Sequence, residues 1–459
     1  MSSQYQVTNP WTNKVVHSFE GVGAAGVDVY VKRARHAFKE NVGRTAHERA
    51  GWLERAATAI EARVEEIAAL AVAHIGKPKR AAAMEIRRSA AFVSACAKHL
   101  HAMTGEALVL DAVPVGKGHY GFTKHVPYGV VAAVTPFNAP VNLLVQKLAP
   151  ALATGNSVIV KPCIEGTEIA ELIVDLFNRS GVPEGLVSVV RGDREEAAAL
   201  AAHPGVDVVT LTGGTAAGDA LARAAGAKKF IGELGGNSAN IVLRDANLDD
   251  AIGRLVMSSF EASGQQCIST QRIIVEKDIF DVFVQKFSDA ASKLKVGDPN
   301  LDDVDVGPVV SRKAATRIRA MIADAEDRGA KIITFGDHKD CLLYPTIVVN
   351  PPSAAALIKD EVFGPVVVVI SANDVDDAIQ IANDCEFGLQ ASCFTSNLSA
   401  AFRMSEELQV GALWVNEASR FRLDNYPFGG VGRSGVGREG LPYALEEYTQ
   451  LKFIGIRPS

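Results

Sequence analysis

One cysteine in the middle of the chain has the sequence surroundings of a reactive thiol. Cys267 lies in the stretch EASGQQCIST, directly behind Gly264, Gln265 and Gln266. A glycine and short polar side chains predict an accessible thiol, and an accessible thiolate is a good nucleophile. The alternative is a buried and inert cysteine, which is the usual state of a lone cysteine and our interpretation of the other five.

Two further polar residues stand where chemistry is commonly placed. Glu233, in FIGELGG, follows an apolar strand and precedes two glycines, and functional groups collect at the carboxyl ends of strands in α/β folds. It could instead be a surface carboxylate. Asn138, in PFNAP, precedes a helical pattern. Its side chain could cap that helix, serve a site as a hydrogen-bond donor, or do both.

The elements that must position these residues alternate in type. Strand-like GVVAAVTPFN, SVIVKP, SVVRG and VDVVTLTGG are separated by amphipathic helical stretches. This alternation predicts an α/β fold with a doubly wound parallel sheet, covered by helices on both faces. The glycine turn in LTGGTAAG could hold a phosphate at a helix N-terminus, or be an ordinary turn. A similar alternation after Cys267 predicts a second α/β domain.

The sequence before this sheet predicts two long helices. Apolar residues recur at helical spacing over 46–75, and GKP at 76–78 ends that helix. A second helix covers the following residues and ends at Gly105.

The bulk composition excludes several classes of partner. The 459 residues carry a net charge of −6 with scattered Lys and Arg, which argues against binding to nucleic acid or to an anionic membrane. The six cysteines form no CxxC pair, so we expect no disulfide framework and no metal site. The start of the chain has no leader pattern, and apolar runs fall short of about 18 residues. A cytoplasmic protein is therefore expected.

Six motifs in order resemble the aldehyde dehydrogenase superfamily. They are PFNAP, KPC at 161–163, IGELGGNSA, GQQC, EVFGP at 361–365 and PFGGVGRSGVGREG at 427–440. The resemblance runs from about Asn9 to the C-terminus. It is strongest to the branch that includes lactaldehyde, phosphonoacetaldehyde and phosphorylated-triose dehydrogenases. The 34 positions between Glu233 and Cys267 also match the family's spacing of base and nucleophile.

The resemblance implies a covalent mechanism. A thiolate at Cys267 would add to an aldehyde, and the resulting oxyanion would expel hydride to leave a thioester. The family's oxyanion donors match the side-chain amide of Asn138 and the backbone N–H of Cys267. Its general base for hydrolysis matches Glu233. Two alternatives remain: a CoA-acylating semialdehyde dehydrogenase, which typically lacks this glutamate, and a non-catalytic scaffold that keeps the fold.

The resemblance also implies NAD as the cofactor, with NADP possible. The implied contacts are Lys161 with the adenosine ribose, Gly213 and Gly214 with the pyrophosphate, Glu361 with the nicotinamide ribose, Phe363 with the ring, and Pro136 and Phe137 in the same site. NAD-specific relatives often carry a glutamate three residues after the lysine, where this chain has Ile164. Glu165 could substitute for it, and we therefore expect only modest discrimination against NADP.

The residues aligned with the substrate tunnel are polar, which predicts a small polar, α-hydroxy or anionic aldehyde. They are Arg88, Asn142, Gln146, Gln266, Arg420 and Arg422. Arg88 is expected to bind an anionic tail, since a buried guanidinium needs a partner. The alternative is an ion pair with Glu85 on the same helix. Gln266 stands where some phosphate-handling relatives carry arginine.

By the same resemblance, we expect three parts in the chain. Residues 1–113 and 134–233 would form the cofactor domain and 234–427 the catalytic domain. Residues 114–133 and 428–459 would form a small β bridging element. GKGHYGFTKHVPYGV and EEYTQLKFIGIRPS alternate like strands that leave the body. We expect them to pair across a homodimer or homotetramer.

Overall fold

The computed structural model describes residues 3–458. Its first large sheet has six strands in the order β19-β9-β8-β5-β6-β7. All neighbours from β9 to β7 pair in parallel, and β19 pairs with β9 in the antiparallel sense. The strands are β5 (Val130–Thr135), β6 (Ser157–Pro162), β7 (Val187–Val189), β8 (Val208–Thr212), β9 (Lys229–Glu233) and β19 (Gly435–Val436).

Helices cover both faces of this sheet, which explains why its strands read as continuous apolar runs. Along β5, Val131 and Ala133 pack into one core, while Val130 and Ala132 pack into another. The first core is closed by α2 (Ala46–Glu61), α3 (Val64–Ile75), α4 (Lys79–His99), α5 (Asn142–Ala153) and α6 (Thr167–Arg179). The second is closed by α1 (Val27–Asn41), α7 (Arg194–Ala202) and α8 (Thr215–Ala225).

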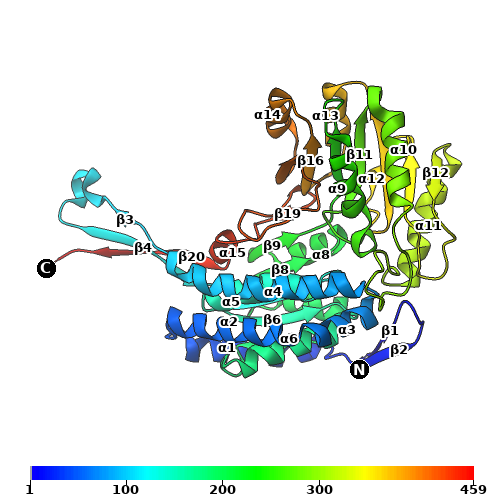
Figure 1. Cartoon of the computed structure of the whole chain (residues 1–459). Helices are drawn as coiled ribbons and strands as arrows, with labels where there is room; N and C mark the ends of the chain where they lie inside the picture. The colour runs from blue at the N-terminus through cyan, green and yellow to red at the C-terminus, as the bar shows by residue number, and fades with distance from the viewer. Residues whose placement is uncertain (1–2, 459) are drawn as a thin grey trace.

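A seven-stranded sheet forms the other half of the body, on the right in Figure 1. Its order is β12-β13-β14-β11-β10-β16-β17, parallel except for β12. The strands are β10 (Ser238–Val242), β11 (Thr270–Glu276), β12 (Lys331–Thr334), β13 (Thr346–Val349), β14 (Val366–Ala372), β16 (Gln390–Phe394) and β17 (Ala412–Val415). The helices are α9 (Leu248–Phe260), α10 (Phe280–Ala291), α11 (Arg312–Asp327), α12 (Ala356–Lys359), α13 (Val375–Asn383) and α14 (Leu398–Glu407).

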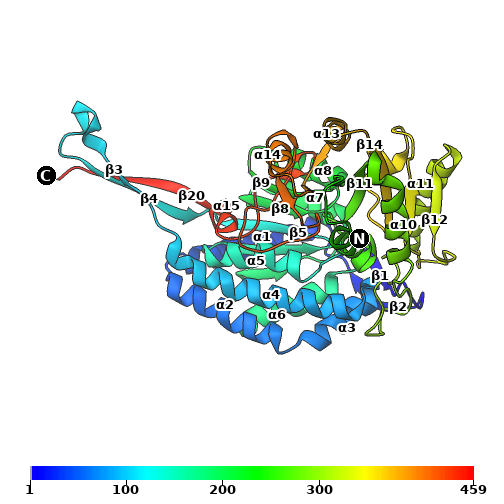
Figure 2. The same ribbon diagram turned by 45° about the horizontal axis from the view of Figure 1, so that its top comes forward.

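A third, antiparallel sheet projects from the body as an arm, and Figures 1 and 2 both show it extending beyond the helices. It joins β3 (Ala107–Leu108), β4 (Tyr120–Pro127) and β20 (Thr449–Ile456), with β4 in the centre. β20 follows α15 (Tyr443–Glu447) at the C-terminal end of the chain. The two segments that the sequence singled out as departing strands thus pair with each other. The remaining strands are β1 (Gln4–Thr8), β2 (Val15–Glu20), β15 (Phe387–Gly388) and β18 (Val431–Gly432).

The two predicted bridging segments, 114–133 and 428–459, each include residues that belong to the body of the protein. Residues 130–133 belong to β5 in the six-stranded sheet. Residues 428–448 include β19, which extends the same sheet, and α15, whose Leu445 is fully buried in the first core. β4 leaves the body and β5 enters the sheet with only Tyr128 and Gly129 between them, so the expected segment ran past the end of β4.

The N-terminal helices also differ from the prediction. The helix expected over 46–75 is two helices, because Arg63 leaves the helical region with φ −119° and ψ 22°. The second helix ends at His99 and continues as a short 3-10 turn to Ala102, not to Gly105. Gly76 has φ 71° and caps α3 as GKP predicted. Among residues 3–458, no helix combines the length and apolarity that crossing a bilayer requires.

Candidate active site

Cys267 lies on a tight loop between α9 and β11. Three consecutive residues before it, Ala262, Ser263 and Gly264, have positive φ values of 51°, 59° and 65°. Two of them are not glycine, so the loop stores backbone strain that the surrounding structure must hold. A Cβ on Gly264 would lie 2.1 Å from the carbonyl oxygen of Gly364, so only glycine fits there. The glycine that suggested an accessible thiol therefore has a packing reason of its own.

Two cavities meet at Cys267, and Asn138 lines both of them. We call the first the glycine-lined cavity. Its other lining residues are Pro136, Phe137, Thr212, Gly213, Gly214, Leu234, Gly235, Glu361 and Phe363. We call the second, of about 300 Å³, the arginine-lined cavity. Its other lining residues are Lys77, Ala81, Met84, Glu85, Arg88, Ala139, Asn142, Leu143, Glu261, Gln266, Ile268, Arg420, Phe421 and Arg422.

Two glycines that follow Glu233, Gly235 and Gly236, let the backbone approach Glu361 and Cys267 closely. A Cβ on Gly236 would lie 2.2 Å from the carbonyl oxygen of Cys267. A Cβ on Gly235 would lie 2.7 Å from a carboxylate oxygen of Glu361. The ELGG stretch thus lies against both the Cys267 loop and Glu361. A side chain at Gly235 or Gly236 would prevent this close approach.

The glycine-lined cavity is framed by two phenylalanines and a buried carboxyl group. Phe137 and Phe363 meet edge to face with ring centroids 5.8 Å apart. Glu361 accepts a hydrogen bond of 3.0 Å from the N–H of Gly236. Burial raises the pKa of Glu361 to about 7, although that hydrogen bond and Arg317 oppose the shift. Gly214 precedes α8 and offers no capping side chain, so the helix N-terminus is open towards this cavity.

Asn138 is held in place by an ion pair that the sequence did not reveal. Lys77 Nζ donates to the backbone carbonyl of Asn138 at 3.0 Å and to Glu85 Oε2 at 2.5 Å. The other oxygen of Glu85 accepts from the N–H groups of Val141 and Asn142, both at 2.9 Å. Glu85 therefore caps α5 and fixes the turn that presents Asn138. The alternative of an ion pair between Glu85 and Arg88 is wrong, because Glu85 bonds Lys77 and this turn instead.

Glu233 ends β9 beside a buried cluster of charges. Lys147 and Glu439 form an ion pair of 3.0 Å, with exposed side-chain fractions of 0% and 4%. Arg422 bonds the second oxygen of Glu439 at 2.8 Å. Both carboxyl oxygens of Glu233 are buried and have no hydrogen-bond partner within residues 3–458. Burial, and after it the charge of Glu439, raises the pKa of Glu233 well above its ordinary value.

Burial favours the neutral thiol of Cys267 over its thiolate. Burial raises the pKa of Cys267 to about 12. The charge of Arg422 opposes this shift, whereas the carboxyl groups of Glu361 and Glu233 add to it. Arg422 is therefore the protein cation that most favours the thiolate. It also lies over the ring of Phe428, with the guanidinium carbon 3.7 Å from the centroid.

The other two arginines of the cavity have carboxylate partners. Arg88 makes a two-pronged bond to Asp424, with Nε–Oδ2 3.0 Å and Nη2–Oδ1 2.7 Å. Arg420 bonds Glu261 at 2.7 Å. Arg88, which we expected to bind an anionic tail, thus has a carboxylate partner within the protein, and its contact with a substrate stays a prediction. Gln146 does not line the cavity, and its side chain is fully buried where it donates to Asp424 at 2.9 Å.

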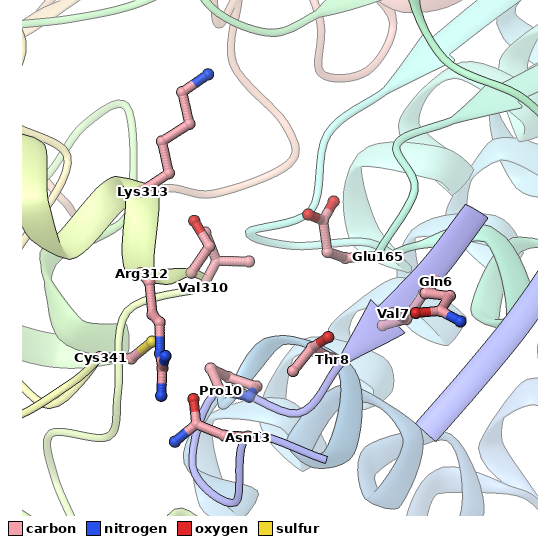
Figure 3. A pocket seen from close by; sticks show the side chains of 11 residues that line it. Gln6, Val7, Thr8, Pro10, Asn13, Glu165, Val310, Arg312, Lys313 and Cys341 are labelled. Carbon is pink, nitrogen blue, oxygen red and sulfur yellow. The ribbon is translucent and has the colours of Figure 1, made fainter. Parts of the chain in front are cut away.

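Two of the residues matched to the cofactor lie outside both cavities. Lys161 is buried, and its Nζ donates to the carbonyl of Pro162 at 2.6 Å. Glu165 lines a separate cavity that Figure 3 shows between the N-terminal strand and the loop before α11. Its backbone carbonyl lies 3.3 Å from His74 Nδ1. Contacts of Lys161 and Glu165 with an adenosine ribose stay predictions.

The structure adds charged residues that sequence reasoning passed over: Lys77, Lys147, Glu261, Asp424 and Glu439. Three of them lie in motifs that were already noticed. Lys77 belongs to GKP, which we interpreted only as a helix end, Glu261 begins EASGQQCIST, and Glu439 belongs to GREG. A charged side chain inside a motif already singled out was the available signal.

Comparison with known proteins agrees with this geometry. The aldehyde dehydrogenase family model matches residues 1–454. The 3-sulfolactaldehyde dehydrogenase of Priestia aryabhattai is 37% identical over 99% of this chain and 95% of its own. The sulfoacetaldehyde dehydrogenase of Neptuniibacter caesariensis is 34% identical over 99% and 100%.

A solved structure extends the agreement to the fold. NADP-dependent glyceraldehyde-3-phosphate dehydrogenase from Bacillus halodurans C-125, complexed with NADP, is 33% identical. It superposes with a TM-score of 0.97 over 99% of this chain and 96% of that one. With a family match over nearly its whole length and a cysteine between two cavities, the chain belongs to the aldehyde dehydrogenase family of oxidoreductases, which act on aldehyde groups.

Proposed function

We propose that the protein is an NAD(P)-dependent, non-acylating dehydrogenase that converts a small polar, α-hydroxy or anionic aldehyde into its carboxylic acid. The observation that carries this proposal is the position of Cys267 and Asn138 where the two cavities join. One cavity would hold the nicotinamide and the other the aldehyde, with the thiol between them. The named relatives that act on sulfolactaldehyde and sulfoacetaldehyde support a small anionic substrate.

The residues of the glycine-lined cavity fit a nicotinamide dinucleotide. The open N-terminus of α8 at Gly214 suits a pyrophosphate, since helix N–H groups and the helix dipole favour anions. Glu361 suits a ribose hydroxyl, and Phe363 suits one side of a planar ring. When bound, this cofactor supplies the hydride acceptor for the aldehyde carbon. The NADP complex of the Bacillus halodurans relative supports the same use here.

In the proposed mechanism Cys267 forms and releases the acyl group. Its thiolate adds to the aldehyde carbon and leaves a tetrahedral oxyanion, which the Asn138 amide and the Cys267 N–H stabilise. Preorganised donors of this kind each contribute about 2.7–4 kcal/mol to lowering a barrier. Loss of hydride from carbon converts the adduct into a thioester. Glu233, as general base, then activates a water molecule that cleaves the thioester to the acid and the free thiol.

The size and polarity of the arginine-lined cavity support a small substrate. Its volume of about 300 Å³ corresponds to roughly ten water-sized volumes. Four cationic side chains and two carboxylates line it, along with the amides of Asn138, Asn142 and Gln266. Such a lining favours a short aldehyde with polar or anionic groups over a long alkyl or aromatic one.

NAD(P)H formation across an aldehyde panel tests the proposed function. Absorbance would be followed with NAD and NADP, with and without CoA, for lactaldehyde, succinate semialdehyde, hexanal and benzaldehyde. We expect turnover without CoA and a higher kcat/KM for the first two aldehydes. Turnover that requires CoA would favour the acylating alternative. Failure with every aldehyde would favour the scaffold.

Cofactor preference should respond to residue 164. Ile164 provides no carboxylate to repel a 2′-phosphate, so we expect wild-type enzyme to use both NAD and NADP. Ile164→Glu should shift the ratio of kcat/KM values towards NAD, with Ile164→Gln as the uncharged control. Wild-type rejection of NADP by a factor of about 1,000, or 4 kcal/mol, would show that another group excludes the phosphate.

The arm gives a testable oligomerisation surface. Several of its apolar side chains are exposed in the single chain: Leu108, Val109, Val115, Tyr120, Phe122, Leu451, Phe453 and Ile456. Exposed apolar groups on an edge sheet favour pairing with another copy. We expect a homodimer or homotetramer in sedimentation velocity, and a shift to monomer for Leu451→Lys with Phe453→Lys. Active wild-type monomer at micromolar concentration would contradict this.

The cytoplasm is the compartment we propose. All six cysteines are free, which suits a reducing environment. Recovery of the protein with cytoplasmic markers in cell fractionation would test this, and recovery outside the cytoplasm would contradict it.

A further inference from the structure

Gln271 lies at an irregularity near the start of β11. Ser238 of β10 pairs with Thr270 of β11, and the next pair is Ala239 with Arg272. β11 therefore holds one residue more than β10 at this point, and Gln271 has no partner in β10. The pairing of β11 with β14 also begins only at Arg272. A bulge of this kind re-aims the side chain of its extra residue, and bulges are common beside active sites.

The side chain of Gln271 bonds the backbone on both sides of Glu361. Its Nε2 donates to the carbonyl of Asp360 at 2.8 Å, and its Oε1 accepts from the N–H of Val362 at 2.9 Å. Gln271 is 6% exposed, so water does not compete freely for these groups. One planar amide therefore fixes the peptide groups before and after Glu361, and we call this arrangement the Gln271 clamp.

The segment held by the Gln271 clamp needs such a restraint. It leads into Phe363, which has φ 50°, and a bulky residue keeps this left-handed conformation only where its surroundings fix it. Both Glu361 and Phe363 line the glycine-lined cavity. Arg317 on α11 also donates to the carbonyl of Glu361, at 3.1 Å, but this arginine is exposed. Gln271 is thus a restraint that acts from the buried side.

We propose that Gln271 is a positioning residue that fixes the carboxyl group of Glu361 for binding the nicotinamide ribose. This rests on the proposed function, in which Glu361 suits a ribose hydroxyl. Gln271 lines neither cavity, so it acts only through the segment it holds. It follows Cys267 by four positions, and the clamp therefore ties the thiol and the cofactor wall to one strand. Displacing reacting groups by about 1 Å can cost about 100-fold in rate.

Replacing Gln271 by methionine tests the clamp without turnover. Methionine keeps the length of the side chain and removes both the donor and the acceptor. In the cofactor-free protein, amide hydrogen exchange of peptides that cover 357–363 should accelerate by roughly 10-fold, and the Kd of NADH in fluorescence titration should rise by a similar factor. Iodoacetamide labelling of Cys267 should stay close to wild type. Unchanged exchange or an unchanged Kd would overturn the proposal.

A shorter amide provides a second variant should Gln271→Met fail to fold. Gln271→Asn keeps the amide but lacks one methylene, so it cannot reach both peptide groups of the clamp. We expect the same increases in exchange and in the Kd of NADH. Wild-type values of both in this variant would overturn the assignment of the clamp to Gln271.

The burst of NADH distinguishes positioning from a merely structural role. In Gln271→Met the rate constant of the burst should fall by roughly 10- to 100-fold, with its amplitude kept. A lower amplitude with an unchanged rate constant would indicate lost folded protein and would overturn the proposal. Asn156→Ala is the matched control. Asn156 is a buried amide that bonds the carbonyls of Ala151 and Tyr448, and it lies before the amino end of β6, away from the cavities. It should lower Tm and keep the burst rate constant.

A double-mutant cycle tests whether Gln271 acts through Glu361. Changes at groups that act together are not additive. In a Glu361→Ala background, Gln271→Met should therefore raise the Kd of NADH by roughly threefold or less, rather than by the factor of about 10 expected in wild type. Equal factors in the two backgrounds would overturn the route through Glu361.

The outcomes separate the clamp from the proposed function. If the wild type binds NADH but oxidises no aldehyde, the proposed function fails, and hydrogen exchange and the Kd of NADH still decide the role of Gln271. If the wild type oxidises aldehyde and Gln271→Met keeps its exchange, Kd and burst rate constant, the clamp is wrong and the dehydrogenase stands. Wild-type protein that binds neither NADH nor NADPH would overturn both.

Discussion

Replacing Cys267 by alanine should abolish aldehyde oxidation. We expect kcat/KM to fall on the order of 10⁴-fold or more, as for other covalent nucleophiles. The Kd of NAD should stay close to wild type, because the thiol takes part only in the chemical step. Stopped-flow absorbance and fluorescence titration with NAD measure the two quantities. Cys385→Ala, a partly exposed free cysteine after α13, is the matched control and should retain activity.

The raised pKa of Cys267 gives this prediction a pH dependence. With a pKa of about 12 in the cofactor-free protein, the neutral thiol dominates at pH 7, and the thiolate fraction rises about tenfold per pH unit below the pKa. Iodoacetamide labelling of Cys267 should therefore accelerate steadily from pH 7 to pH 10. A plateau below pH 8 would mean that the thiolate is already formed. Near wild-type turnover by Cys267→Ala would remove Cys267 from the mechanism.

Replacing Glu233 by glutamine should separate the two halves of the reaction. A general base contributes roughly 10²- to 10⁴-fold, so steady-state turnover should fall within that range. Hydride transfer does not need the carboxylate, and a pre-steady-state burst of NADH, one per active site, should persist. Rapid-mixing absorbance at saturating aldehyde measures both phases. Loss of the burst together with turnover would show that Glu233 acts before the thioester forms.

The protonation of Glu233 predicts different pH dependences of deacylation for the wild type and for Glu233→Gln. Because burial and Glu439 raise its pKa, the base form increases as pH rises, and wild-type deacylation should accelerate from pH 6 upward. The glutamine variant should lack this dependence. The same pH dependence in both proteins would assign the titration to another group.

The sequence predicted the elements that position the site well, because their periodicity is local. SVIVKP is a strand over its full predicted length, and the strand before Asn138 and the glycine turn at Gly213 lie where the pattern placed them. The departures of β4 and β20 from the body were also visible in their alternation. Asn138 follows the carboxyl end of β5 in one sheet, whereas Cys267 precedes the amino end of β11 in the other. Local periodicity could not predict that these two ends meet.

The pairing of charges could not be predicted in the same way. Arg88 and Asp424 are 336 positions apart, and Lys147 and Glu439 are 292 apart. Arg88 on α4 and Lys147 on α5 meet these carboxylates only because both helices pack against the segment that carries Asp424 and Glu439. The local alternative, Arg88 with Glu85, satisfied helical spacing but ignored the open N-terminus of α5, which Glu85 caps. Arg88 lines the arginine-lined cavity while it bonds Asp424, and its contact with a substrate stays a prediction.

The most direct test is to identify the covalent intermediate on the Glu233→Gln protein. The variant would be mixed with NAD and sulfoacetaldehyde, quenched in acid and analysed by peptide mass spectrometry. We expect the peptide that contains Cys267 to gain the mass of the aldehyde less two hydrogens, as a thioester requires, in step with the NADH burst. An NADH burst with an unmodified Cys267 peptide, or with the adduct on another cysteine, would contradict catalysis through Cys267.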